Sequence, residues 1–303
     1  MSKEIDIFIV KNENSVKEVN LSRLVEIGGN NAKSKVMYEP CRDAFKAQVD
    51  QLEVSANIEY VEAGDIPSKT DSNLIGIFDE NYLIPQRYLL SAISLYNMYN
   101  SYGAFCGPIS THSNEKPVDW FICEIASQYK VYSLNEFNNV LSFDITKEPA
   151  HLPPTMGCVF AGRFYNEAGG YSPTLSPRGI IKNESSLVNR IASLGSILYS
   201  KSLEAAYYIT PNEFDIQNFS RYFYELGYCK GIQLATEAES KYDTLWKMFV
   251  ESPESIDNRT LHFTFLRDHM EEGQKKKYAE KLAMIKCMYH VGMFEGINGQ
   301  KIL

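Results

Sequence analysis

The stretch LIGIFDENYLIP, residues 74–85, decides the fold prediction. Its apolar residues run directly into Asp79, and Asn81 follows two positions later. Alternation along a strand end places Asp79 and Asn81 on the same side, so both can face one ligand. A hard divalent cation takes oxygen ligands, and Mg²⁺ commonly takes one or two carboxylates while substrate phosphates complete its shell. The alternative is a strand-end turn in which the two side chains hydrogen-bond to local backbone.

Around this stretch, short apolar runs alternate with polar, helix-compatible runs. Strands are expected at 5–10, 35–39, 57–63, 72–81 and 102–110, and helices at 15–29, 42–52 and 85–99. This order is typical of βαβ units and predicts a largely parallel sheet covered on both faces. Open α/β sheets bind ligands at the carboxyl ends of their strands. The loops expected to form a site therefore follow Val10, Glu39, Ala63 and Phe78.

The composition is that of an ordinary globular protein. The 303 residues are 44% hydrophobic and 22% charged, which is enough to bury a full core. The net charge of −8 argues against a general nucleic-acid binder. The six cysteines form no CxxC pair, so buried reduced thiols are expected. No apolar run approaches the length of a membrane helix, and we expect a soluble cytoplasmic protein.

The sequence changes character near residue 211. Beyond it the sequence is dominated by helix-compatible segments, punctuated by glycine and proline. We therefore predict an α/β domain at 1–210 and a helical extension at 211–303.

The segment NESSLVNRIASLG, residues 183–195, predicts a short helix with Glu184 in its first turn. Asn183 can cap it and Gly195 ends it. Its buried face is expected to hold Leu187, Ile191 and Leu194. Glu184 is either an acid that interacts with the helix dipole, worth roughly 0.3–1 kcal/mol, or a catalytic base at a helix start.

The segment GCVFAGRFYNEAGGYSPTLSPRG, residues 157–179, carries five glycines. Glycine permits close backbone approach or positive φ. The segment is either a loop that lies against a flat ligand or a β-hairpin with a glycine turn. It contains neither GK[ST] nor GxGxxG, so it is not a nucleotide phosphate loop.

Together these pieces resemble the family 2 glycosyltransferases of the GT-A fold, over roughly residues 5–230. In that family a strand ends in D-x-D with a proline a few residues on, and FDENYLIP at 78–85 is similar. The family then shows a segment of the form fr...GGf and the pattern ED..L..R....G. AGRFYNEAGGY at 161–171 and NESSLVNRIASLG at 183–195 match these. CGPI at 106–109 resembles the glycine-rich strand end before the acceptor site.

The resemblance implies a GT-A fold, which is α/β and Rossmann-like with a mostly parallel central sheet. It implies an inverting hexosyl- or pentosyltransferase that uses a nucleotide-sugar donor such as a UDP-sugar. Glu184 falls on the family's usual base, which deprotonates the acceptor hydroxyl. A divalent cation, Mn²⁺ or Mg²⁺, would be held at Asp79 and Asn81.

The resemblance also implies further contacts. Donor contacts are expected from Asn12, Glu39, Glu62, Asp79, Glu80, Asn81, Arg163 and Arg178. Acceptor contacts are expected from Gly107, Gly169, Gly170 and Tyr171. The acceptor is a glycan, a small molecule or, less in keeping with the acidic charge, a modified nucleic-acid base. The helical extension would supply acceptor contacts or a homodimer surface.

Three departures from the family pattern leave another function open. The segment GDIPSKTDS, residues 64–72, is short and lacks the family's usual Arg-Asn pair, which helps hold the donor. The third D-x-D position is Asn81, and the first acid of the ED pair is Asn183. A non-catalytic sugar- or nucleotide-binding relative would account for both. A nucleotidyltransferase would share the architecture and a metal-binding acid. It should also carry a glycine-rich phosphate loop after the first strand, which VKNENS at 10–15 lacks.

Overall fold

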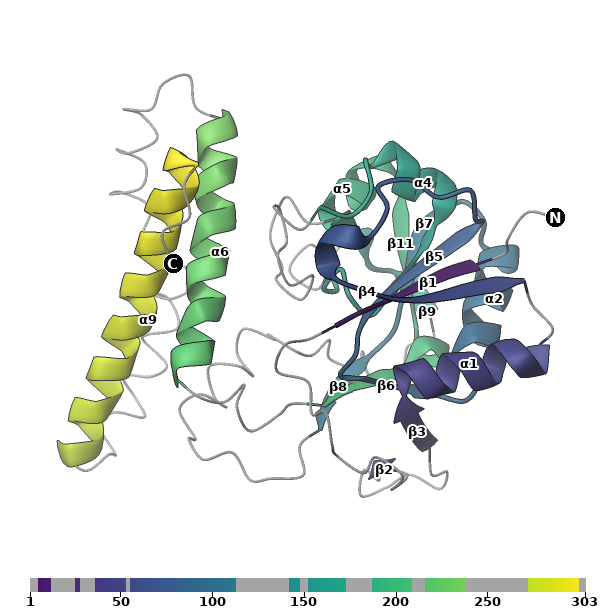
Figure 1. The fold of residues 1–303 in the computed structure, drawn as a ribbon, viewed down its shortest axis with the longest axis horizontal. Coiled ribbons are helices and arrows are strands. Elements are labelled where there is room, and N and C mark those ends of the chain that lie inside the picture. Colours follow the sequence, from purple (N-terminus) through teal and green to yellow (C-terminus); the bar gives the residue numbers. More distant parts are fainter. Residues whose placement is uncertain are drawn as a thin grey trace. The chain divides into compact units, whose positions relative to one another are not determined.

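The computed structural model of the chain describes residues 5–11, 25–27, 36–52, 55–112, 142–147, 152–172, 187–208, 216–237 and 272–299. The chain divides into two compact units, and the division after the last strand follows Pro211. Within the described ranges, the first unit holds two β-sheets with their helices, and the second holds two long helices (Figure 1).

A seven-stranded sheet forms the centre of the first unit. In spatial order its strands are β4 (Ala56–Val61), β1 (Ile5–Val10), β5 (Leu74–Asp79), β10 (Cys158–Ala161), β7 (Tyr102–Cys106), β11 (Ser196–Ser200) and β9 (Ser142–Asp144). Strands β4, β1, β5, β7 and β11 run in one direction, while β10 and β9 run in the other. The predicted α/β class with a mostly parallel central sheet is confirmed.

Helices cover both faces of this sheet. Every residue of β1 and β5 is buried, as expected of central strands that read as continuous apolar runs. On one face the Phe78 ring packs against Phe45 of α1 (Cys41–Leu52) at 4.8 Å and against Tyr88 of α2 (Tyr88–Met98) at 5.7 Å. On the other face Phe160 packs against Tyr165 of α4 (Gly162–Glu167), with ring centroids 6.3 Å apart.

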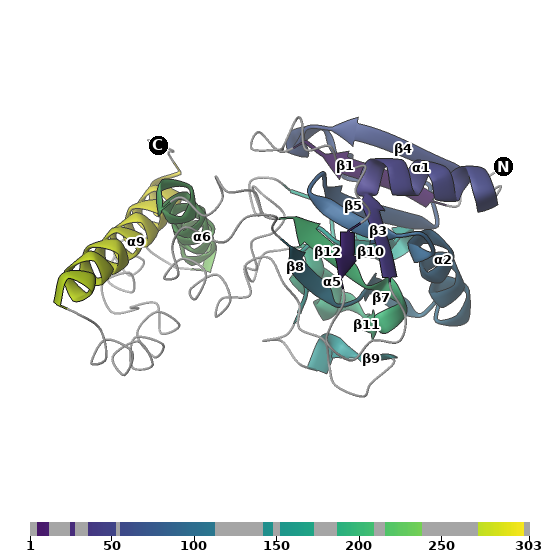
Figure 2. The ribbon, with the colours of Figure 1, turned by 90° about the horizontal axis from the view of Figure 1, so that it is seen from below.

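A smaller sheet continues from the carboxyl ends of the large one. Its order is β2 (Val25–Ile27), β3 (Val36–Pro40), β6 (Tyr82–Pro85), β12 (Ala205–Tyr208) and β8 (Ile109–His112). Each of β5, β7 and β11 leads into a strand of this sheet, through Glu80–Asn81, Gly107–Pro108 and the short helix η4 (Lys201–Leu203) respectively. Strand β12 lies beside β8 and pairs with it in parallel (Figure 2). The junction between the sheets therefore lies at the edge expected to bind ligands.

The remaining elements of the first unit are short. The 3-10 helix η1 (Ala63–Asp65) follows β4, and η2 (Ile145–Lys147) follows β9. Helix α5 (Leu187–Leu194) leads into β11. It packs against the sheet, because a Cβ on Gly103 of β7 would lie 2.6 Å from the Ile191 side chain.

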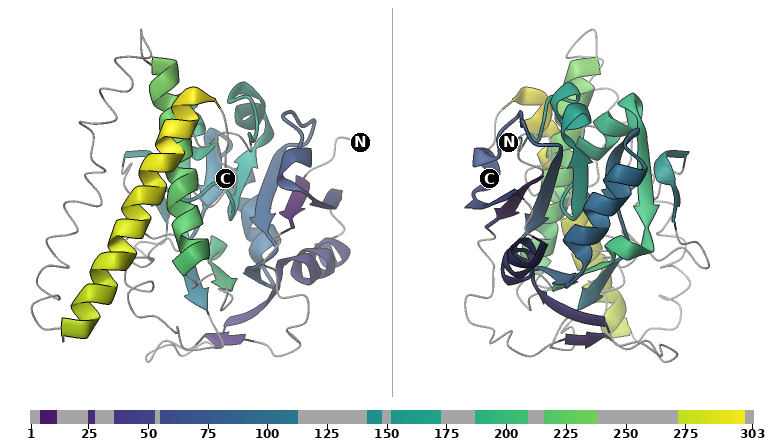
Figure 3. Two further views of the ribbon diagram at one scale, coloured as in Figure 1. Left: turned by 60° about the vertical axis from the view of Figure 1, so that its left-hand side comes forward. Right: turned by 90° about the vertical axis from the view of Figure 1, so that its right-hand side faces the viewer.

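The second unit is a pair of parallel helices, α6 (Ile216–Glu237) and α9 (Glu272–Asn298), which lie side by side (Figure 3). Their closest approach is lined by Gly227 and Gly231 of α6 and by Gly292 and Gly296 of α9. A Cβ on any of the four would lie 1.9–2.2 Å from a backbone oxygen of the opposite helix. The predicted helical C-terminal extension is confirmed for these two segments.

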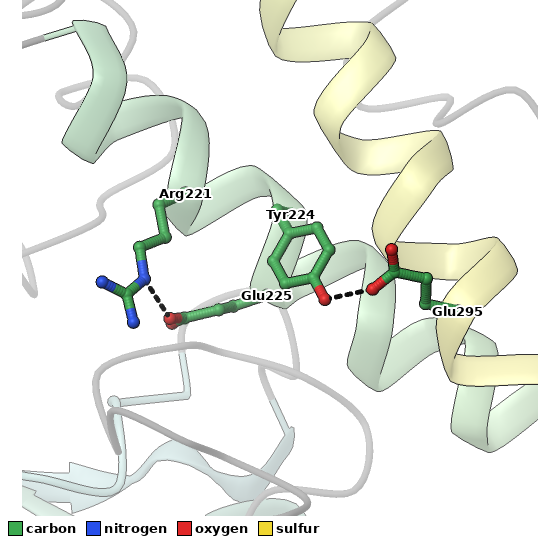
Figure 4. Close-up of polar contacts among 4 residues, drawn as sticks. All are labelled: Arg221, Tyr224, Glu225 and Glu295. Carbon is green, nitrogen blue, oxygen red and sulfur yellow. Dashed lines mark hydrogen bonds and ion pairs between the residues drawn. The ribbon is translucent and has the colours of Figure 1, made fainter. Parts of the chain in front are cut away.

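Two polar contacts accompany the glycine contacts of this unit. The Tyr224 hydroxyl hydrogen-bonds to the Glu295 carboxylate across the helix pair, and Arg221 Nε lies 3.4 Å from Glu225 Oε1 within α6 (Figure 4). Both carboxylates are buried. No described helix is long and apolar enough to cross a membrane.

Several local predictions were wrong. The helix expected at 15–29 is contradicted at Val25–Ile27, which form a strand because they pair with β3. Strand β6 was missed, and α2 begins at Tyr88 rather than at Pro85. The expected burial of thiols holds for Cys41, Cys106, Cys158 and Cys229, whereas Cys287 is exposed on α9.

Candidate functional site

Asp79 ends β5 at the carboxyl edge of the large sheet. Its side chain is 6% exposed, and Oδ1 accepts a hydrogen bond of 2.9 Å from the backbone N–H of Asn81. This bond is the strand-end turn that the sequence offered as an alternative, since aspartate readily bonds the backbone two residues on. The turn fixes the carboxylate at the start of the junction between the two sheets.

Strand β12 closes over the same turn from a distant part of the sequence. The Tyr207 hydroxyl lies 3.4 Å from Asp79 Oδ1 and 3.5 Å from Asn81 Nδ2. The backbone N–H of Tyr208 donates to the Asn81 carbonyl at 2.9 Å. Sequence analysis missed Tyr207, because AAYY at 205–208 carries only the signal of a buried strand.

Two buried groups near Asp79 stay uncharged. Burial, together with the negative charge of Asp79, raises the pKa of the Cys41 thiol, whose Sγ lies 3.6 Å from the Asp79 carbonyl oxygen. Burial also raises the pKa of Tyr82, whose hydroxyl donates to the Met156 carbonyl at 2.8 Å. Both groups stay protonated at neutral pH. A charge at Asp79 therefore acts in surroundings that screen it weakly.

Asp79 and Asn81 offer one carboxylate and one amide to a cation. Oxygen atoms of these types are the ligands that Mg²⁺ takes. Among the described residues, no three His, Cys, Asp or Glu side chains gather in a way that could hold a metal ion. The pair therefore fits a cation whose shell is completed by substrate phosphates, and the metal site stays a prediction.

The other predicted acids occupy different positions. Glu80 follows Asp79, and its backbone N–H donates to the Val10 carbonyl at 3.0 Å. Glu62 is exposed after β4 and pairs with Lys11, with Nζ 3.2 Å from Oε1. Both lie at the carboxyl edge. Glu39 lies in β3 of the small sheet, where Gln86 donates to it at 3.4 Å.

Arg163 does not lie with Asp79. Strand β10 runs antiparallel to β5, so Ala161 pairs with Leu74 at the start of β5, and α4 begins at the amino edge. Arg163 is exposed there and donates to the Asn100 carbonyl at 2.9 Å. The expectation that it contacts the donor near Asp79 is corrected by this register.

The glycine-rich segment is neither a hairpin nor an extended loop in its described part. After β10 it forms α4, which ends at Glu167 and is followed by Gly169 and Gly170 with φ of +79° and +71°. A Cβ on Gly170 would meet the Ser68 backbone at 2.3 Å, and one on Gly107 would meet the Leu203 carbonyl at 2.2 Å. These two glycines are thus required for close backbone packing.

Tyr171 packs into the same region. Its side chain is 4% exposed, and its backbone N–H donates to the Tyr165 hydroxyl at 3.0 Å. The Tyr165 hydroxyl in turn donates to the Pro67 carbonyl at 2.6 Å. The acceptor contacts expected of Gly107, Gly169, Gly170 and Tyr171 stay predictions.

Asn12, Arg178 and Glu184 lie outside the described residues, as does the predicted cap Asn183. The helix predicted with Glu184 in its first turn is present as α5, which begins at Leu187 in the described residues, and Leu187 and Ile191 are buried as predicted. Leu194 is 41% exposed, which contradicts its predicted place on the buried face. It is the last residue of α5, where the chain turns at Gly195 toward β11.

No protein-family model matches this sequence, and no curated protein matches it. Similar solved structures include S. aureus TarS 1–349 in complex with UDP, at 10% identity over 99% of this chain and 93% of that chain, with a TM-score of 0.34. The same protein in complex with UDP-GlcNAc has 10% identity over the same shares, with a TM-score of 0.38. The fold assignment itself rests on strand order and register.

Proposed function

We propose that this chain transfers a sugar from a nucleotide-sugar donor to an acceptor hydroxyl with inversion. The observation that carries the proposal is the position of the Asp79–Asn81 turn. It ends a central strand at the carboxyl edge, where open α/β sheets take ligands. A carboxylate and an amide oxygen at that edge suit a donor diphosphate and a divalent cation.

The direction of α5 supports Glu184 as the base. Ser196 pairs with Tyr102, the first residue of β7, so α5 ends at the amino edge of the sheet. The helix packs along β7 and β11. Its start at Leu187 is therefore directed toward the carboxyl edge, and Glu184 precedes it by three residues in the sequence.

The proposed reaction needs two contributions from the chain's own residues, a base and side chains at the diphosphate end of the donor. Glu184 takes the proton of the acceptor hydroxyl as that oxygen forms a bond to the anomeric carbon. The bond from that carbon to the donor diphosphate breaks on the opposite face, and the nucleoside diphosphate leaves with the electron pair. Asp79 and Asn81 would hold a divalent cation at the diphosphate end of the donor. A cation bound there would supply positive charge to the leaving group.

The remaining donor contacts stay predictions. Asn12, Glu39 and Glu62 would contact the nucleoside, and Arg178 would contact the diphosphate. Lys11 pairs with Glu62, and Lys11 and Arg42 both lie over the exposed Tyr60 ring, at 5.6 and 5.5 Å from its centroid.

A thermal-shift screen tests the donor site. The protein is heated with UDP-, GDP-, CMP- and dTDP-sugars and the bare nucleotides, each with and without Mn²⁺. A ligand that binds only the native state stabilises it by RT ln(1 + [L]/Kd). We expect a shift selective for one nucleotide and larger with Mn²⁺. No shift with any of them would overturn the donor site.

Two variants then separate binding from turnover. Glu184→Gln should keep the donor shift and lower the turnover of sugar by about 10²–10⁴-fold, the usual contribution of a general base. Asp79→Asn should remove the enhancement by Mn²⁺. Ser193→Ala, an exposed position near the end of α5, serves as the control. Unchanged turnover in Glu184→Gln would contradict the base assignment. Donor binding by the wild type without any sugar turnover would instead favour a binding protein without catalysis or a nucleotidyltransferase.

A further inference from the structure

Tyr207 is a fully buried tyrosine whose hydroxyl meets two predicted ligand-binding side chains. Its side chain is 0% exposed. The hydroxyl donates toward Asp79 Oδ1 at 3.4 Å and accepts from Asn81 Nδ2 at 3.5 Å. Tyr207 comes from β12, 128 residues beyond Asp79. No motif of the sequence assigns it a role.

Neighbouring tyrosines show that this contact is not a general consequence of burial. The Tyr82 ring lies 5.2 Å from the Tyr207 ring and is equally buried, yet its hydroxyl donates to the Met156 carbonyl. The Tyr88 hydroxyl likewise donates to the Gly157 carbonyl, at 3.3 Å. Among these three tyrosines, Tyr207 is the one whose hydroxyl contacts the Asp79–Asn81 pair.

The contact constrains both side chains at once. A hydroxyl that donates to one carboxylate oxygen restricts rotation of the carboxylate about its last bond. Accepting from the Asn81 amide nitrogen turns the amide oxygen away from the hydroxyl. The backbone bond from Tyr208 to the Asn81 carbonyl holds β12 against the same turn, so the hydroxyl cannot drift from the pair.

We propose that Tyr207 is a positioning residue that pre-organises Asp79 and Asn81 to receive a divalent cation together with the donor diphosphate. The inference rests on the proposed function and deepens it, because it names a group that sets the strength of that site. Groups that hydrogen-bond to metal ligands orient them, and their loss commonly lowers metal affinity by about 10–100-fold.

The test compares Tyr207→Phe with Tyr82→Phe, a matched loss of one hydroxyl from an equally buried neighbouring ring. Mn²⁺ binding is measured by water-proton relaxation, without nucleotide and with UDP, GDP, CMP or dTDP. The thermal midpoint is measured in metal-free buffer. Tyr207→Phe should raise the Kd for Mn²⁺ about tenfold. This is the lower end of the usual loss of about 10–100-fold, because the contacts of the Tyr207 hydroxyl with Asp79 and Asn81 are long. Tyr82→Phe should leave this Kd unchanged, although it lowers the midpoint.

The possible results separate a failure of the role proposed for Tyr207 from a failure of the proposed metal site. If the wild-type protein binds no Mn²⁺ under any condition, the proposed metal site and the inference both fail. If the wild type binds Mn²⁺ and Tyr207→Phe binds it equally well, only the inference fails. Equal weakening in both variants would assign the loss to a loosened core and would also overturn the role of Tyr207.

Discussion

Arg190 joins α5 to the end of α4. Its guanidinium donates to the Ala168 and Gly170 carbonyls, the latter at 2.7 Å. These carbonyls flank the two positive-φ glycines that end α4. Burial lowers the pKa of Arg190, but an arginine remains charged at neutral pH. Arg190, which lies on α5, thus holds the turn formed by Gly169 and Gly170 after α4.

Replacing Arg190 with lysine should destabilise the protein. An ammonium group cannot reach both carbonyls with the planar fork of a guanidinium, and hydrogen bonds from charged groups contribute about 1.5–3 kcal/mol. We expect the free energy of unfolding in urea to fall by about 1–2 kcal/mol. Arg163→Lys, at an exposed arginine on α4 with one backbone contact, should change it by less than about 0.5 kcal/mol. Equal losses would contradict the bridging role.

The buried hydroxyl and thiol groups near Asp79 make stability depend on pH. The pKa of Cys41 is raised above its ordinary value of 9.0, chiefly by burial. Burial likewise raises the pKa values of Tyr82 and Tyr88 above 10.0. Above those ordinary values the unfolded chain loses protons that the native chain keeps. Stability is therefore fully present below pH 9 and falls as the pH rises.

For each such group, the free energy of unfolding should fall by about 1.4 kcal/mol per pH unit above the ordinary pKa of the group, because only the unfolded chain loses the proton there. Urea midpoints measured from pH 8 to 11 should therefore decline beyond pH 9 and decline more steeply beyond pH 10. Cys41→Ala should make the slope between pH 9 and 10 shallower by one such contribution. Cys287→Ala, which removes an exposed thiol, is the control. An unchanged slope in Cys41→Ala would refute the assignment.

The α6–α9 pair depends on four glycines that bring two backbones together. Each helix carries a G-x-x-x-G pattern, at 227–231 and 292–296, and these patterns face each other. The spacing of four residues places both glycines of a helix on one face. Close contact therefore replaces the larger side chains that usually separate packed helices.

Gly292→Ala should loosen this pair, even though alanine favours helix by about 1 kcal/mol over glycine. The added Cβ would lie 1.9 Å from the Tyr224 carbonyl oxygen. Overpacking typically costs about 1–3 kcal/mol, which equals or exceeds the gain in helix propensity. Hydrogen exchange by mass spectrometry should show faster exchange in peptides of α6 and α9. Peptides of β1 and β5 should exchange as in the wild type. Gly64→Ala, where a Cβ meets nothing within 4 Å, should leave all of them unchanged.

The division into two units has a consequence for unfolding. The strands that carry Asp79 and Tyr207 belong to the first unit, and α6 and α9 belong to the second. Multi-domain chains commonly unfold in more than one step. A ligand raises only the stability of the part that binds it. Nucleotide bound at the proposed donor site should therefore raise the unfolding midpoint of the first unit and leave that of the second unchanged.

Differential scanning calorimetry should resolve two transitions. The nucleotide chosen by the donor screen should raise the midpoint of one of them, and Gly292→Ala should lower the midpoint of the other. A shift of both midpoints by nucleotide would mean that residues of the second unit bind the donor as well. That result would contradict a donor site confined to residues 1–210.

Sequence alone determined the features that are local and periodic. The apolar runs within 5–10 and 72–81 predicted strands, and both segments contain a buried central strand of the large sheet. The pattern of 42–52 predicted α1, and LVNRIASLG predicted α5 with Leu187 and Ile191 buried. Burial on one face leaves a period in the sequence, so these elements could be predicted.

Only the tertiary structure decided which distant segments meet. Val25–Ile27 form a strand because β3 lies beside them, and GRFYNE forms a helix despite the glycines around it. The reversed direction of β10 places Arg163 at the edge opposite Asp79. Tyr207 reaches Asp79 across 128 residues. Contacts between segments this far apart leave no period or spacing in the sequence, because they depend on strand order, direction and register.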